Sequence, residues 1–414
     1  MSLDQQFADA MGQLLGPNFP DQLGLAVSGG GDSMAMLALA QSWARVWGVG
    51  LRVVTVDHGL RPESAGEAQM VAQECAILNI PHDIVRWQWD GLGNVQDAAR
   101  NARLSLIDSW RGGIEHVLMA HTRDDVAETF LIRLARGSGV DGLSKMQAKR
   151  HIPTTKGAGF HIIRPCLDMR RTNLRSYASA CHVPWVDDPS NEDPKYTRVQ
   201  MRKALPLLED LGISADVLVD TAGRMARASE ALKARAYETA RSLCAPCDQG
   251  LISFARDGFA KLEPDTQTRL LGAACMWVSG AHYKPRAAAV VDLCAALLAG
   301  GAGTLIGAKA ETTHNKILVF REYGAVGAIC SEDRIWDGRW TVSGPWQAGY
   351  QLRALGEGIA HCTDWRTAQQ PRAAVMASPA VWCAEDLIAA PIAHFNPDWH
   401  AQIVTPFTSY LLSH

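Results

Sequence analysis

Glycines, hydroxyl groups and one carboxylate occur together near the amino end of the chain, in the run Ser28-Gly29-Gly30-Gly31-Asp32-Ser33. It follows an apolar run and precedes residues spaced like the buried face of a helix. Glycines let a phosphate approach the backbone closely, and the first amides of a helix favour its negative charge. A carboxylate beside a phosphate repels it unless Mg²⁺ lies between them, so Asp32 predicts a metal. The run is therefore interpreted as a pyrophosphate cradle that binds Mg²⁺ through Asp32.

Two better-known glycine motifs are excluded. A P-loop places a lysine directly before its terminal Ser or Thr, and Asp32 holds that position here. The Rossmann spacing of three glycines in six residues is not met either. For the glycines alone, a strand-to-helix turn without a ligand is an equally good interpretation. The flanking Ser28 and the Asp32-Ser33 pair favour a phosphate site.

A second group of reactive side chains occurs at 121–129, with the sequence HTRDDVAET. Asp125 and Glu128 are three residues apart, so a helix would place them on one face. Paired carboxylates there can bind a cationic substrate or accept its proton. The alternative is a helix start whose acids complement the helix dipole. Because that alternative does not account for His121 directly after a strand, a functional pair is favoured.

Strands and helices must alternate to position these residues. Apolar runs predict strands at 23–27, 51–56, 83–87 and 116–120, and helical periodicity predicts helices at 34–47, 65–78, 95–110 and 125–135. This order predicts the α/β class, with a doubly wound parallel sheet covered by helices on both faces. Ligands of such sheets bind beyond the carboxyl ends of the strands. The cradle, Asp57-His58 and His121 are all expected there, in one crevice.

The remaining chain predicts further domains, as its length of 414 residues also does. Residues 1–213 are expected to form the catalytic domain. Residues 214–325 are expected to be mainly helical, with one long helix over 207–243 and a hairpin within 304–320. Residues 330–414 contain several tryptophans and predict a small β-rich domain.

Composition narrows the class of protein. The net charge is −3, but basic residues dominate from 145 to 175, where Asp168 is the one acid. Such a cluster indicates a polyanionic partner, with a solvated charged surface as the alternative. The sequence contains no run of about 18 apolar residues, so no membrane-spanning helix is predicted. The first residues do not resemble a signal peptide. The ten cysteines are scattered, which suits a reducing cytoplasm. The Cys244/Cys247 pair is interpreted as having no metal role.

The motif SGGGDS resembles the signature of the N-type ATP pyrophosphatases, or PP-loop family, which cleave ATP between the α- and β-phosphates. Further motifs are similar to the tRNA(Ile)-lysidine synthetase branch of that family: VDHGLR at 56–61, ARNAR at 99–103, HTRDDVAET at 121–129, RGSGVDGL at 136–143, Arg164-Pro165 and WVDDPSNEDPKYTR at 185–198. The resemblance covers residues 23–205 and is looser beyond them. Two positions depart from it: Val126 stands where the branch usually has Gln, and Leu104 where it usually has Tyr.

The resemblance implies a ligase that attaches free L-lysine to C2 of the wobble cytidine of a tRNA(Ile) with a CAU anticodon, which changes codon reading from AUG to AUA. The implied cofactors are ATP and Mg²⁺. The cytidine oxygen attacks the α-phosphate and releases pyrophosphate, and the lysine amine then displaces AMP. The implied catalytic residues are Asp32, Asp125 and Glu128, the last two recognising lysine. The implied ATP-binding residues are Ser28, Gly29, Gly30, Gly31, Asp32, Ser33, Asp57, His58 and His121.

Five arginines are candidates for contacts to tRNA, because guanidinium groups bind phosphate bidentately: Arg100, Arg103, Arg164, Arg198 and Arg202. A surface ion pair is the alternative for each. The domains after residue 213 are expected to bind the rest of the tRNA. DNA and membranes are not expected as partners, and the oligomeric state, a homodimer included, is left open. The alternative functions are tRNA 2-thiolation by another PP-loop enzyme, amidation of GMP or NAD precursors, and RNA binding without catalysis.

Overall fold

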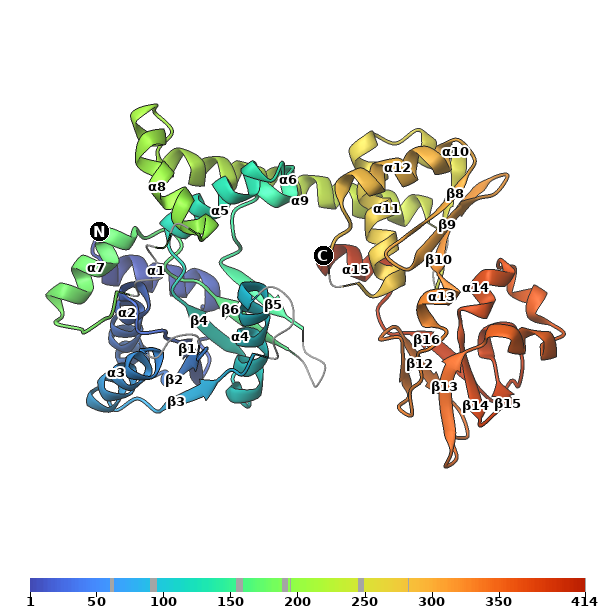
Figure 1. Cartoon of the computed structure of the whole chain (residues 1–414), viewed down its shortest axis with the longest axis horizontal. Helices are drawn as coiled ribbons and strands as arrows, with labels where there is room; N and C mark the ends of the chain where they lie inside the picture. Colours follow the sequence, from blue (N-terminus) through green and yellow to red (C-terminus); the bar gives the residue numbers. More distant parts are fainter. Residues whose placement is uncertain are drawn as a thin grey trace. The chain divides into compact units, whose positions relative to one another are not determined.

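The computed structural model describes residues 1–59, 63–89, 95–153, 159–187, 193, 195–244, 249–281 and 283–413. Their contacts divide the chain into two units, Met1–Ser229 and Glu230–His414 (Figure 1). The units are described separately. The predicted division into three domains stays a prediction.

The first unit is built on a six-stranded sheet with the strand order β3-β2-β1-β4-β6-β5. All neighbouring strands run parallel except β5, which is antiparallel to β6. The strands are β1 (Gln22–Ala26), β2 (Gly50–Asp57), β3 (His82–Arg86), β4 (His116–Met119), β5 (Lys149–Ile152) and β6 (Phe160–Ile163). The predicted doubly wound α/β sheet is thus confirmed. Because β1 pairs with β2 on one side and β4 on the other, the strand order reverses between β1 and β4, where ligands of such sheets bind.

Helices cover both faces of this sheet (Figure 1). Alternate residues of β1 divide between the faces: Leu23 and Leu25 pack with helices α1, α2 and α7. On the other face a Cβ atom at Gly24 would lie 3.1 Å from Trp110 of α4, so only glycine fits there without displacing that ring. The helices of this unit are α1 (Leu3–Leu15), α2 (Gly31–Trp47), α3 (Ser64–Ile77), α4 (Val95–Arg111), α5 (Arg123–Ala135), α6 (Val140–Leu143), α7 (Arg171–Ala180) and α8 (Thr197–Asp210).

The single helix predicted over 207–243 is wrong. Helix α8 ends at Asp210, and α9 (Ala215–Leu243) starts after a turn. Gly212 has a φ of +83° in this turn, a left-handed conformation that interrupts a right-handed helix. The start of α9 packs on α5 through Leu218 and Val219, so the first unit extends past residue 213.

The second unit begins with a four-stranded antiparallel sheet of order β7-β10-β9-β8. Helices α11 and α12 pack on it. The predicted hairpin is confirmed as β9 and β10, which are joined by 313–315. The elements of this part are β7 (Ile252–Ala255), α10 (Arg256–Ala260), α11 (Pro264–Ser279), α12 (Ala287–Leu298), β8 (Ala302–Leu305), β9 (Ala308–Thr312), β10 (Lys316–Arg321) and α13 (Tyr323–Val326).

Two three-stranded antiparallel sheets, β11-β12-β16 and β13-β14-β15, follow. The strands predicted for this region are therefore present. Trp336, Trp340 and Trp399 are buried in its core, so these tryptophans stabilise the fold. The elements are β11 (Ile335–Trp336), β12 (Trp340–Ser343), β13 (Tyr350–Ala354), α14 (Arg372–Met376), β14 (Pro379–Cys383), β15 (Asp386–Ala389), β16 (His400–Ile403) and α15 (Phe407–Ser413), with 3₁₀ helices at Gly356–His361, Trp365–Ala368 and Pro391–Ala393. Within the described part of the chain, no helix is both long and apolar enough to cross a membrane.

Candidate active site

The glycine run forms the predicted turn between β1 and α2. Gly29 has a φ of +87°, which requires glycine, and α2 begins at Gly31 without a side chain capping its amino end. The backbone N–H of Ser28 donates to the Ser33 hydroxyl (3.2 Å), which donates to the carbonyl of Gly30 (2.9 Å). The two serines thus hold the loop closed around an uncapped helix start, which is suited to an anion.

Asp32 lies in the first turn of α2. Its Oδ2 accepts a hydrogen bond from Nε of Arg171 (2.9 Å), while its Oδ1 is buried with no hydrogen-bond partner. Burial raises the pKa of Asp32, although the charge of Arg171 opposes this. Among the described residues, no group of three or more His, Cys, Asp or Glu side chains could hold a metal by itself. One carboxylate fits Mg²⁺, which is commonly bound by one or two carboxylates together with substrate phosphates.

Asp125 has two sets of partners because it also caps its own helix. Its Oδ2 accepts hydrogen bonds from the backbone N–H (2.8 Å) and hydroxyl (2.9 Å) of Thr122, which completes a capping box at the start of α5. Its Oδ1 lies 3.2 Å from Nη2 of Arg171 and 4.0 Å from Nη1 of Arg198. Burial opposes ionisation of Asp125, but these two guanidinium groups outweigh it and its pKa is lowered.

Glu128 lies one turn further along α5 and is fully buried. Its Oε1 accepts hydrogen bonds from Arg171 (3.0 Å) and Arg202 (2.8 Å). Its Oε2 lies 3.3 Å from Nε of Arg198, within ion-pair distance but without hydrogen-bond geometry. Three guanidinium groups therefore surround one carboxylate, which compensates for its burial.

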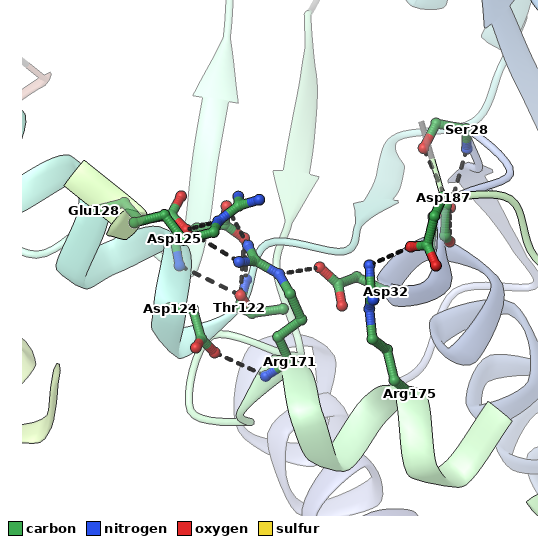
Figure 2. A network of polar contacts seen from close by, with 12 residues as sticks. Ser28, Asp32, Thr122, Asp124, Asp125, Glu128, Arg171, Arg175 and Asp187 are labelled. Carbon is green, nitrogen blue, oxygen red and sulfur yellow. Dashed lines mark hydrogen bonds and ion pairs between the residues drawn. The ribbon is translucent and has the colours of Figure 1, made fainter. Parts of the chain in front are cut away.

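Arg171 joins the two predicted motifs into one site. Its guanidinium group contacts Asp32, Asp125 and Glu128, and Figure 2 shows it extending from α7 between the acids of α5 and Asp32. Its backbone N–H donates to Oδ2 of Asp124 (2.7 Å), which fixes the start of α7 against α5. Sequence reasoning counted Arg171 only as a member of the basic cluster, because its role depends on contacts with two distant segments. Its place shortly after the Arg164-Pro165 motif is the one local signal that could have indicated it.

A second arginine of α7 covers the cradle. Arg175 donates to Oδ1 of Asp187 (2.6 Å), and a Cβ atom at Gly31 would lie 3.2 Å from its side chain and 3.4 Å from Trp185. The backbone N–H of Val186 donates to the carbonyl of Gly29 (3.0 Å). The segment that begins the WVDDPSN motif is thereby placed beside the cradle.

The other residues predicted to bind ATP lie at strand ends. Asp57 ends β2 and accepts hydrogen bonds from the backbone N–H of Gly59 (2.9 Å) and the hydroxyl of Ser64 (2.7 Å). Burial opposes ionisation of Asp57, but these donors lower its pKa. His58 lies 3.3 Å from Arg103, and burial, together with that charge, lowers the pKa of His58. Neither residue belongs to the cluster around Arg171.

His121 follows β4 and accepts from Nε of Arg164 (3.3 Å). Arg164 also donates to the carbonyl of Gln147 (2.7 Å) and is buried. The side chain of Arg100 lies outside the described residues. Five arginines were predicted to bind tRNA, and these roles stay predictions: Arg100, Arg103, Arg164, Arg198 and Arg202.

Of the two positions that depart from the resemblance, Val126 lies in the core and Leu104 is partly buried at its edge. Val126 is buried among residues of α5, α8 and α9, and Leu104 packs against the cluster on the α4 face. Both residues therefore act in packing. Cys244 is a free cysteine, whereas Cys247 lies outside the described residues.

Comparison with known proteins found a family model and curated relatives that match this chain. Residues 3–208 match the family model described as a PP-loop domain. A tRNA(Ile)-lysidine synthase of Ruegeria pomeroyi is 41% identical over 95% of this chain and 95% of its own length. A tRNA(Ile)-lysidine synthase of Wolbachia pipientis is 34% identical over 78% of this chain and 77% of its own. A solved U34-tRNA thiolase from Methanococcus maripaludis is 16% identical over 54% of this chain and 78% of its own, with a TM-score of 0.44.

Proposed function

The chain belongs to the tRNA(Ile)-lysidine synthase family, and we propose that the cluster of Asp32, Asp125, Glu128 and Arg171 is where the reaction of that family takes place. The enzyme uses ATP to ligate L-lysine to C2 of the wobble cytidine of tRNA(Ile) with a CAU anticodon. The cytidine is first adenylated with release of pyrophosphate, and lysine then displaces AMP. The observation that carries the assignment is that one guanidinium group joins the cradle carboxylate to the acid pair of α5.

We propose that Ser28–Ser33 bind the polyphosphate of ATP. The uncapped start of α2 and the hydroxyl groups of Ser28 and Ser33 supply donors for phosphate oxygens. Oδ1 of Asp32 has the free lone pairs that Mg²⁺ needs, and the metal would neutralise charge on the phosphates. The predicted ATP contacts of Asp57, His58 and His121 belong to the same proposal.

Asp125 and Glu128 are proposed to bind the ammonium group of lysine. Its unperturbed pKa is about 10.4, so the amine needs an anionic site and a proton acceptor before it attacks carbon. Oδ1 of Asp125 is the carboxylate oxygen that capping leaves free. Because Asp125 has a lowered pKa, it is ionised at neutral pH, as an ammonium site requires.

The target cytidine must leave the anticodon stack to reach this site, at a cost of a few kcal/mol. The predicted arginines and the basic residues between 145 and 175 other than Arg170 and Arg171 are proposed to bind tRNA phosphates. The second unit is proposed to bind the rest of the tRNA. We further propose a cytoplasmic location, without DNA or a membrane as partner. A homodimer remains open.

Sulfur transfer is the alternative within the PP-loop family, and Cys166, which lies near Asp32, is not suited to it. Cys166 is fully buried near Asp32, and burial, together with that carboxylate, raises the pKa of the thiol. Sulfur chemistry requires an accessible thiolate, which such a pKa prevents. Cys166 is therefore not expected to carry sulfur in this reaction.

The deciding experiment incubates the protein with ATP, Mg²⁺, labelled lysine and transcripts of CAU-bearing isoleucine and methionine tRNAs. Label is expected in the isoleucine transcript alone, with release of AMP and pyrophosphate. AMP release without lysine incorporation would contradict the proposal and indicate another nucleophile. Absence of AMP would favour an RNA-binding protein without catalysis.

A further inference from the structure

Arg171 occupies oxygens that the proposed substrate needs. The ammonium of lysine is assigned to Asp125 and Glu128, yet Oδ1 of Asp125 and Oε1 of Glu128 both lie against the guanidinium group of Arg171. Capping commits the other oxygen of Asp125 to Thr122. Lysine and Arg171 therefore compete for the same carboxylate oxygens.

The charge of the cluster leads to the same conclusion. Asp32, Asp125 and Glu128 carry three negative charges, and Arg171, Arg198 and Arg202 carry three positive ones. The cluster is thus balanced before any substrate enters. The ammonium group of lysine would therefore be repelled by the guanidinium groups of the cluster. Solvent screens this repulsion only weakly in a partly buried site.

Arg171 differs from the other two arginines in its reach. Arg198 and Arg202 extend from α8 and contact acids of α5, with side chains 41% and 36% exposed. The side chain of Arg171 is 16% exposed and also contacts Asp32 in the cradle. Of the three arginines in the cluster, Arg171 is therefore the one whose guanidinium group contacts both the proposed ATP site and the proposed lysine site.

We propose that Arg171 is a positioning residue that makes lysine binding depend on ATP, an inference that rests on the proposed function. Without ATP, the guanidinium group holds Asp125 and Glu128 and blocks the ammonium site. When the polyphosphate enters the cradle, the guanidinium group moves from the carboxylates to phosphate oxygens, which bind it bidentately. The backbone stays in place, because the N–H of Arg171 is held by Asp124. Oδ1 of Asp125 is then released for the ammonium group of lysine, while Arg198 and Arg202 keep their contacts with Glu128.

The test measures binding of labelled lysine to the full chain by equilibrium dialysis, with and without a non-hydrolysable ATP analogue and Mg²⁺. In the unmodified protein the analogue is expected to tighten lysine binding roughly tenfold, a usual size for coupling between sites. Arg171→Gln is expected to bind lysine without the analogue and to lose this dependence. Arg170→Gln is the matched control: it removes the same charge one residue earlier, where the partner is Asp216, and is expected to retain the dependence.

Equal lysine binding with and without the analogue in the unmodified protein would overturn the inference. Loss of lysine binding by Arg171→Gln in both conditions would also overturn it, because Arg171 would then hold the acid pair in its binding geometry. If Arg171→Gln does not fold, Arg171→Lys carries the test: it keeps the charge, but an ammonium group cannot bridge three carboxylates, so the dependence of lysine binding on the analogue should shrink.

ATP–pyrophosphate exchange with tRNA and no lysine tests the proposed function separately. Exchange without coupling rejects the role of Arg171 alone, whereas absence of exchange rejects the function.

Discussion

The two carboxylate oxygens of Asp125 have different partners, so one oxygen stabilises the helix and the other is available for substrate binding. Oδ2 caps α5 through Thr122, and Oδ1 lies against Arg171. The two interpretations of the acids, helix capping and substrate binding, are therefore compatible at this residue. Glu128 does not cap the helix. It is buried and contacts all three arginines of the cluster.

Asp125→Ala is expected to raise the KM for lysine roughly tenfold to a hundredfold, since a hydrogen bond to a charged group contributes about 1.5–3 kcal/mol. The KM for ATP should change little. Steady-state kinetics with each substrate varied in turn measure the two values. Asp125→Asn is the control, because its amide oxygen can still accept hydrogen bonds from Thr122. Equal changes in both KM values would contradict the lysine assignment.

Gly29→Ala tests the cradle. Its φ of +87° places the new side chain in a left-handed conformation, which costs about 1–2 kcal/mol. We expect a lower free energy of unfolding by about that amount and a higher KM for ATP. Gly30→Ala is the matched control for stability, because the nearest atom to its Cβ is 3.8 Å away and no positive φ is involved. Similar denaturation midpoints for both variants would argue against strain at Gly29.

Among the elements, β4, β6 and β5 carry a row of histidines away from the cradle. His116 pairs with His161, which pairs with His151, and the ring centroids lie 5.3 and 5.1 Å apart. His116 begins β4, so the row lies toward the end of the sheet opposite the carboxyl ends that form the site. Burial, together with the charge of Lys149, lowers the pKa values of His116 and His161.

This row predicts that the free energy of unfolding decreases in mild acid. The lowered pKa values mean that the unfolded chain, whose histidines titrate near about 6.5, takes up protons before the folded protein does. Stability is therefore full above about pH 6.5 and falls as the pH drops through the lowered folded values. Denaturant titrations between neutral and mildly acidic pH measure it. His161→Gln should flatten the dependence, and an unchanged slope in that variant would assign the effect to other groups.

The break between α8 and α9 is a second feature at this scale. Arg198 and Arg202 reach Glu128 from α8, while the start of α9 packs on the apolar side of α5. Met201 and Leu205 of α8 also pack in that apolar cluster. Two segments on either side of the turn at Gly212 therefore contribute to the cluster around α5.

At the scale of the whole molecule, the proposed active site lies in one unit, and the other unit is proposed to bind the tRNA outside the anticodon. Every residue of the cluster lies in Met1–Ser229. A chain truncated after Ser229 is expected to bind ATP but to lose at least about tenfold in tRNA affinity, because phosphate contacts supply much of such binding. Filter binding and thermal denaturation measure affinity and folding. Full affinity with retained discrimination against methionine tRNA would contradict the proposed role of the second unit.

The amino-acid sequence by itself determined the features that depend on local spacing. The cradle, the acid pair of α5 and the alternation of strands and helices each lie within a few neighbouring residues, where backbone geometry follows from residue type. The burial of Trp336 and the turn at Gly212 were not predicted, because both depend on what packs against them. Only the tertiary structure placed Arg171, which contacts Asp32 across 139 residues of sequence and Glu128 across 43. These contacts depend on where α7 packs against α2 and α5, and no local pattern in the sequence records that packing.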